Sequence, residues 1–218
     1  MSDPRAFILS QTRLRPVPLV PEIVLHVADE SVPLWQKTEQ ELGAQGLAPP
    51  YWAFAWAGGQ ALARYVLDHA DLVRGARVLD LAAGSGLVGI AAAKAGAAPV
   101  MAAEVDAFAE AAISLNAEAN AVYLDVVIAD LLDQPAPPGR RYDVVLIGDL
   151  FYERDTARRA LAFAHRHAAT GTQVIIGDPG RAYLPRERLV KLAAYAVPVT
   201  RELEDQDIKC TSVWRLAL

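Results

Sequence analysis

A glycine-rich segment, VLDLAAGSGLVG, occupies residues 78–89 and separates a hydrophobic stretch from a helix-like pattern. Its glycines at 84, 86 and 89 have the G-x-G-x-x-G spacing of nucleotide-binding loops. Glycine lets a ligand approach the backbone closely, and the first turn of a following helix offers N–H groups to it. The spacing predicts a cofactor that contains an adenine nucleoside, held by the loop residues Gly84, Ser85 and Gly86.

Three acidic residues at the ends of predicted strands narrow the choice of cofactor. Asp80 directly precedes the loop, where it would repel a pyrophosphate but would bind the ammonium group of S-adenosylmethionine. Glu104 ends the next strand and can accept both ribose hydroxyls, a role that NAD proteins share. Asp130 follows the third strand, where binding of the adenine amino group and simple capping of a turn are equally open.

Two further predicted strands end in polar motifs at the same edge of the sheet. GDLFYE spans residues 148–153 and GDPGR spans residues 177–181. Because open α/β sheets bind ligands at the carboxyl ends of their strands, these motifs should meet the acidic residues above at one edge. Asp149 and Tyr152 are candidates for contacting the substrate, and Gly148 is a candidate for contacting the cofactor.

The elements that must position these residues alternate between strand and helix along the chain. This alternation favours a parallel sheet covered by helices on both faces, and two consecutive strands at the end should pair antiparallel. We predict an N-terminal extension over residues 1–50, with a strand or hairpin around 22–28, and one α/β domain over 51–218. The expected strands of the sheet are 77–81, 99–104, 123–129, 142–148, 172–177, 199–203 and 208–216, and the expected helices include 87–95, 107–120, 153–168 and 185–196, with a proline-rich loop at 134–139.

Composition excludes several classes of protein. The chain of 218 residues carries a net charge of −5 and has a pI near 5.4, which argues against nucleic acid as the main partner. No apolar run reaches the length of a membrane span, and no signal-peptide core follows the start, so we expect no membrane partner and a cytoplasmic location. The single cysteine, Cys210, is expected to be buried, and the four histidines have no metal-ligand spacing.

Four segments in this order resemble the seven-strand lysine methyltransferases of the electron-transfer-flavoprotein β-subunit type: PPYWAFAWAGGQALARY, VLDLAAGSG, GDLFY and IGDPGR. The resemblance covers roughly residues 20–214. It implies a Rossmann-like sheet of seven strands, mostly parallel with an antiparallel final strand. It also implies S-adenosylmethionine-dependent methylation of protein lysines near the recognition loop of the flavoprotein.

The resemblance also implies roles for individual residues. Trp56 matches a tryptophan that lies against the cofactor, and the motif from Asp149 to Tyr152 helps to place the target lysine. We expect Asp149 to hold the amine, Phe151 and Tyr152 to line its channel, and a neutral lysine to attack the methyl group in line. The chain departs from the family at Ala82, where a glycine is usual; alanine suffices there unless φ is positive.

Three alternatives remain open at the level of sequence. A methyltransferase of this kind could act on another protein, such as a ribosomal protein. The literal glycine fingerprint and Glu104 also fit an NAD-dependent oxidoreductase, although Asp80 argues against it. A silent binding module would retain the fold without the activity. The sequence leaves open the oligomeric state, the lysines that are modified and the number of methyl groups added.

Overall fold

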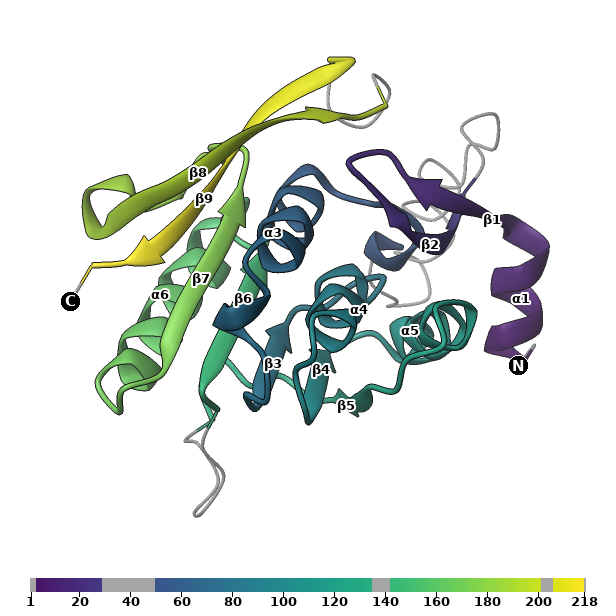
Figure 1. Ribbon diagram of the computed structural model, residues 1–218, viewed down its shortest axis with the longest axis horizontal. Coiled ribbons are helices and arrows are strands. Elements are labelled where there is room, and N and C mark those ends of the chain that lie inside the picture. The colour runs from purple at the N-terminus through teal and green to yellow at the C-terminus, as the bar shows by residue number, and fades with distance from the viewer. Residues whose placement is uncertain (1–2, 29–49, 135–141, 201–205, 218) are drawn as a thin grey trace.

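The computed structural model describes residues 3–28, 50–134, 142–200 and 206–217. Within these residues a seven-stranded sheet has the order β5-β4-β3-β6-β7-β9-β8 (Figure 1). The five strands from β5 to β7 are parallel, and β9 is antiparallel to both β7 and β8. The predicted fold class is therefore confirmed. The strands are β3 Val78–Leu81, β4 Val100–Glu104, β5 Asp125–Ile128, β6 Val144–Gly148, β7 Gln173–Asp178, β8 Leu189–Pro198 and β9 Ile208–Leu216.

Helices cover both faces of the sheet (Figure 1). Strand residues alternate between two apolar clusters: Leu146 joins α3, α4 and α5 in one, whereas Val145 and Ile147 join α6 in the other. The period of two along a strand explains this division. No helix among the described residues is both long and apolar enough to cross a membrane. The helices are α3 Ala57–Asp68, α4 Leu87–Lys94, α5 Ala107–Ala119 and α6 Arg154–Ala168, with short 3-10 helices η2 Tyr51–Ala53, η3 Ala70–Leu72 and η4 Arg186–Arg188.

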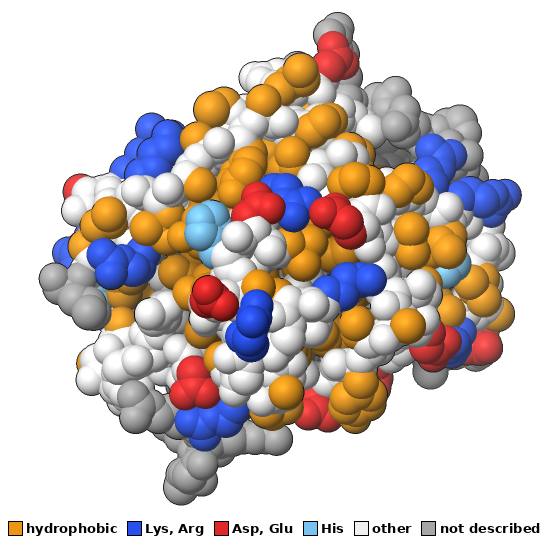
Figure 2. Space-filling model, viewed as in Figure 1, with side chains coloured by type: hydrophobic (Ala, Val, Ile, Leu, Met, Phe, Trp, Pro, Cys, Tyr) orange, Lys and Arg blue, Asp and Glu red, His pale blue; other side chains and the backbone are white. Residues whose placement is uncertain are grey.

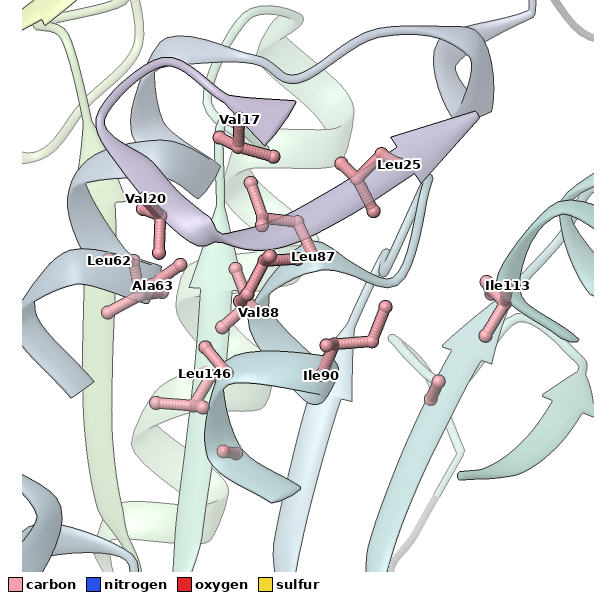
Figure 3. Close-up of a cluster of buried hydrophobic side chains, with 14 of the residues drawn as sticks. Val17, Val20, Leu25, Leu62, Ala63, Leu87, Val88, Ile90, Ile113 and Leu146 are labelled. Carbon is pink, nitrogen blue, oxygen red and sulfur yellow. The ribbon is translucent and has the colours of Figure 1, made fainter. Parts of the chain in front are cut away.

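The start of the chain forms a helix and a hairpin that share the core of the sheet. The predicted hairpin is present as β1, Thr12–Val17, and β2, Val20–Ala28, and the helix α1, Pro4–Gln11, precedes it. Figure 3 shows apolar side chains of the hairpin lying over those of α3 and α4. The side chain of Asn120 also pairs with the backbone of β2 at Val24, accepting from its N–H at 3.1 Å and donating to its carbonyl. Residues 29–49 of the predicted extension lie outside the described residues.

Four expectations about the chain after residue 133 are wrong or fall partly outside the described residues. The predicted helix at 185–196 is wrong: after η4, these residues form β8, because they pair with β9 from end to end and this pairing overrides their helix propensity. The partner strand of β9 is thus β8 and not the predicted strand 199–203, of which residues 201–203 lie outside the described residues. Cys210 is exposed rather than buried, on β9 opposite Ala196 of the edge strand. Of the proline-rich loop only Gln134 is described.

The surface carries charges of both signs. On the face shown in Figure 2, the described basic and acidic side chains are interspersed and form no continuous basic stripe. Among the described residues, some charged side chains pair across distant segments of the chain, as Arg64 does with Glu22 at 2.7 Å and Arg77 with Asp143 at 3.1 Å. Exposed pairs of this kind contribute little to stability, so the fold depends mainly on the two apolar clusters.

Candidate active site

A cavity of about 620 Å³ opens where β3, β4 and β6 end, within the usual size range of small-molecule sites. Most of the residues predicted from sequence line it. Gly86 and Phe151 are absent from this lining. The predicted residues that it brings together are Trp56, Asp80, Gly84, Ser85, Glu104, Asp130, Gly148, Asp149 and Tyr152.

The two glycines of the loop have different surroundings: the backbone of Gly84 is accessible, whereas Gly86 is tightly packed at the N-terminus of α4. Gly84 has a φ of +53°, and a Cβ on it would come no nearer than 3.8 Å to the carbonyl oxygen of Tyr51, so a ligand can approach its backbone. Gly86 has a φ of +80° and is the N-cap of α4; a Cβ there would lie 3.1 Å from Ile113. Gly86 thus serves packing rather than the cavity. Ala82 adopts a φ of +55°, the condition under which alanine is strained, so this departure from the family pattern has a cost.

Asp80 is a buried carboxylate that faces both the loop helix and the cavity. Its side chain is only 1% exposed, and Oδ2 accepts a hydrogen bond of 2.7 Å from the backbone N–H of Gly89. A Cβ at Gly89 would lie 3.1 Å from the same oxygen, so the glycine permits this approach. Burial raises the pKa of Asp80 to about 7. A buried carboxylate with one backbone donor retains the capacity to accept further hydrogen bonds from a cation.

Glu104 and Asp130 are both fixed by backbone donors at the ends of their strands. Glu104 accepts from Gly84 N–H at 3.3 Å through Oε1 and from Val105 N–H at 2.7 Å through Oε2. Asp130 accepts from the backbone N–H of Leu132 at 3.0 Å and from Arg159 at 2.6 Å. Asp130 therefore does cap a turn, and it also lines the cavity. The structure therefore shows the capping role of Asp130, and binding of an adenine amino group at this position stays a prediction.

Asp149 follows β6 with a φ of +55°, and its carboxylate lies between a helix start and an arginine. Oδ2 accepts from the backbone N–H of Gly59, in the first turn of α3, at 2.8 Å. Oδ1 accepts from Nε and Nη2 of Arg181 at 3.1 and 2.7 Å. Burial raises the pKa of Asp149 to about 6, although the guanidinium of Arg181 acts in the opposite direction. The helix N-terminus and the arginine together favour the ionised carboxylate.

Aromatic side chains line the cavity beside Asp149. The rings of Tyr51 and Tyr152 are 5.7 Å apart, and the indole Nε1 of Trp56 donates to the carbonyl oxygen of Tyr51 at 2.9 Å. Trp52, like Tyr51, lines the cavity. Phe151 does not: it is fully buried in the cluster beneath α6, because consecutive residues after the strand point in different directions. The expected lining by Phe151 is therefore replaced by Tyr51.

Three residues that contact or adjoin Asp149 have no substrate-binding or cofactor-binding role predicted from the sequence: Arg181, Gly58 and Gly59. Arg181 lies in the quoted GDPGR segment after the last parallel strand, and the glycine pair lies in the quoted tryptophan-rich segment. Both motifs can be recognised in the sequence, but their hydrogen bonds to Asp149 are tertiary contacts that the sequence does not reveal. Among the described residues, no group of histidine, cysteine and acidic side chains could hold a metal ion.

The sheet order, the antiparallel β9 and the cavity with carboxylates at successive strand ends define a Rossmann-like methyltransferase. The family model described as ribosomal protein L11 methyltransferase matches residues 60–148. The chain is 36% identical to the electron transfer flavoprotein beta subunit lysine methyltransferase of Xenopus laevis over 97% of this chain and 86% of that protein. It is 35% identical to the Homo sapiens protein of the same name over 90% of this chain and 75% of that one.

The chain belongs to the electron transfer flavoprotein beta subunit lysine methyltransferase family. This membership confirms the resemblance seen in the sequence. It also argues against the alternative that the protein is an NAD-dependent oxidoreductase. The fold is shared with the T. thermophilus 16S rRNA methyltransferase solved with AdoMet and guanosine, at a TM-score of 0.54 and 22% identity over 75% of this chain and 43% of that chain. The protein is accordingly an S-adenosylmethionine-dependent methyltransferase.

Proposed function

We propose that this protein methylates lysines of the electron transfer flavoprotein β subunit, near its recognition loop. The observation that carries the proposal is that one cavity is lined both by the loop at Gly84 and Ser85 and by Asp149 with Tyr152. Cofactor and substrate groups can therefore meet in one cavity. The names of the relatives, at about one third identity over most of the chain, support this choice of substrate.

The cavity residues fit S-adenosylmethionine. The buried carboxylate of Asp80 suits the ammonium of the methionine part, and the fixed carboxylate of Glu104 suits the ribose hydroxyls. Asp130, Gly148 and Trp56 complete the proposed binding set around the open backbone of Gly84. When bound, the cofactor would supply an electrophilic methyl group on a sulfonium sulfur, and the lone pair of the amine nitrogen would take this methyl group with the sulfur as leaving group.

The remaining residues would position the lysine amine. Asp149 offers it a carboxylate held rigidly by Gly59 N–H, and the rings of Tyr51 and Tyr152 exclude water from the lysine stem. Catalysis then comes mainly from orientation of the amine toward the methyl group. The amine must lose its proton to solvent before attack, and the methylated amine forms directly as a cation, because the positive charge passes from sulfur to nitrogen with the methyl group.

A second candidate substrate, a ribosomal protein, has the family match to ribosomal protein L11 methyltransferase in its favour. That match covers residues 60–148 and therefore leaves out Tyr51 before it and Asp149 and Tyr152 after it. The match therefore supports the assignment of the cofactor-binding half of the protein and carries no information about its substrate. The relatives with the flavoprotein name match along the substrate half as well, which favours the flavoprotein.

The test is methyl transfer from labelled S-adenosylmethionine to purified electron transfer flavoprotein β subunit, with lysine mass shifts as the readout. Wild type should add methyl groups, and Asp149→Ala should lose transfer while calorimetry still detects cofactor binding. Full activity of Asp149→Ala would refute the role of Asp149. Cofactor binding without transfer to the flavoprotein, but with transfer to ribosomal protein L11, would refute the proposed substrate.

A further inference from the structure

Arg181 and Asp149 form a partly buried ion pair at the substrate end of the cavity. Their side chains are 17% and 11% exposed, and two guanidinium nitrogens of Arg181 donate to the same carboxylate oxygen. The guanidinium carbon also lies 5.7 Å from the centre of the Trp56 ring. The arginine thus brings a permanent positive charge to the place where the proposed function requires a lysine amine.

The backbone of Arg181 is fixed by a second carboxylate. Oδ1 of Asp178, at the end of β7, accepts from Gly180 N–H at 2.6 Å and from Arg181 N–H at 2.7 Å. Asp178 is fully buried. The turn that carries Arg181 is therefore anchored to the sheet, and the guanidinium meets Asp149 from a defined direction.

Methyl transfer imposes a condition on the charge of this site. Only the neutral lysine amine has the lone pair that attacks the methyl group, yet a free lysine with a pKa near 10.4 is almost entirely an ammonium at neutral pH. An uncompensated buried carboxylate would stabilise this ammonium and raise its pKa further. A cation already paired with the carboxylate has the opposite effect, because like charges at short range disfavour each other.

We propose that Arg181 is a positioning residue that compensates the charge of Asp149, so that the site receives the target lysine as a neutral amine. The inference rests on the proposed function, since it requires a lysine substrate. Asp149 can then accept a hydrogen bond from the amine without holding it as an ion pair. Arg181 acts through Asp149 and needs no contact with the reacting atoms.

Other charged and titratable groups face this pair from the elements around it. Tyr152 follows β6 and its ring lies beside that of Tyr51 on η2. Burial and the interaction with Tyr51 raise the pKa of Tyr152, so its phenol stays neutral at physiological pH. Lys209 of β9 lines a shallow hollow with Arg181. Arg186 of η4 lies near Gly180 and lowers the pKa of Asp178, which burial raises. Within this set, Arg181 is the cation that donates to Asp149.

The test is the dependence of kcat on pH, with saturating S-adenosylmethionine and flavoprotein β subunit. In Arg181→Gln, we expect kcat at pH 7.5 to fall about tenfold and to recover toward wild type by pH 9.5, because losing the cation raises the pKa of the bound lysine by about one unit. Arg181→Lys keeps the charge and should keep the wild-type profile. Arg158→Gln, which removes an arginine from an exposed pair with Asp155, is the matched control.

Two results would overturn the inference. An equal loss at every pH would make Arg181 a structural residue only, and a gain at every pH would make it an obstacle that the substrate displaces. Unfolding midpoints and cofactor affinity establish that each variant is folded. Label transfer by wild type tests the proposed function without any Arg181 variant, so an unshifted profile in a working enzyme refutes this inference alone.

A measurement on wild type covers the case in which Arg181→Gln does not fold. The protein is saturated with S-adenosylhomocysteine, which cannot transfer a methyl group, and its affinity for the flavoprotein β subunit is measured at pH 7 and pH 9. A site that prefers a neutral amine should bind more tightly at pH 9, and weaker binding at pH 9 would overturn the inference. Lysine-acetylated β subunit controls for titration elsewhere in the interface.

Discussion

Gly58 in the first turn of α3 and Gly177 in β7 lie so close that a Cβ on either would overlap the carbonyl oxygen of the other. The same Cβ on Gly58 would lie 2.6 Å from Oδ2 of Asp149. This close approach lets the next residue, Gly59, donate its backbone N–H to Asp149. The glycine pair in the tryptophan-rich segment is therefore a condition for the geometry of the substrate site.

Gly58→Ala should destabilise the fold by about 1–3 kcal/mol, because the helix start must move away from β7. Gly59→Ala is a matched control, since a Cβ there would have its nearest neighbours at 3.9 Å and alanine favours a helix by about 0.5–1 kcal/mol. Chemical denaturation of both variants measures the difference. Equal stability of the two variants would contradict the packing described above.

Ala82→Gly should raise the free energy of unfolding by about 0.5–1 kcal/mol, because relief of the left-handed strain exceeds the added entropy of the unfolded chain. The prediction depends on the φ of +55° at Ala82. Its neighbour Ala83 is not among the described residues with positive φ, so Ala83→Gly should be destabilising by about 0.5–1 kcal/mol. Denaturation with urea checks whether the two changes have opposite signs.

The affinity for S-adenosylmethionine should fall as pH is lowered through the range around 7. Burial raises the pKa of Asp80 to about 7, so acid neutralises the carboxylate that is proposed to bind the ammonium group. Calorimetric titrations between pH 5.5 and 8.5 measure this dependence. Asp80→Asn should bind S-adenosylmethionine weakly, and its affinity should no longer depend on pH in this range. Asp71→Asn changes a surface carboxylate that is 96% exposed and should behave as wild type. A flat profile in wild type would argue against contact between Asp80 and the ammonium.

The same group should make the ligand-free protein less stable as pH rises. The pKa of Asp80 is raised from 3.8 to about 7 in the folded state, so between these values the native protein binds more protons than the unfolded chain. Stability from this group is therefore present below pH 4 and is lost as pH rises to 7. The stability of Asp80→Asn minus that of wild type should therefore increase as pH rises from 5 to 8, as measured by thermal unfolding. A constant difference across this range would contradict the raised pKa.

Much of the cofactor side could be predicted from local sequence. The glycine spacing, Asp80 and Glu104 all lie within residues 80–104, and a parallel sheet brings the ends of its strands to one edge. The cavity does bring these residues together. Their contacts with a cofactor, the catalytic role of Asp149, the domain boundary at residue 50 and the cytoplasmic location stay predictions.

Local sequence is enough to predict the alternation of strands and helices, the family and the edge of the sheet at which the polar residues meet, because periodicity and loop motifs are local properties. The folded structure was needed to show that residues 189–198 are a strand, since their partner β9 lies further along the chain. It also placed Phe151 in the core and joined Asp149 to Arg181, 32 residues away. Such contacts depend on the direction of each side chain after its strand ends, which no spacing in the sequence specifies.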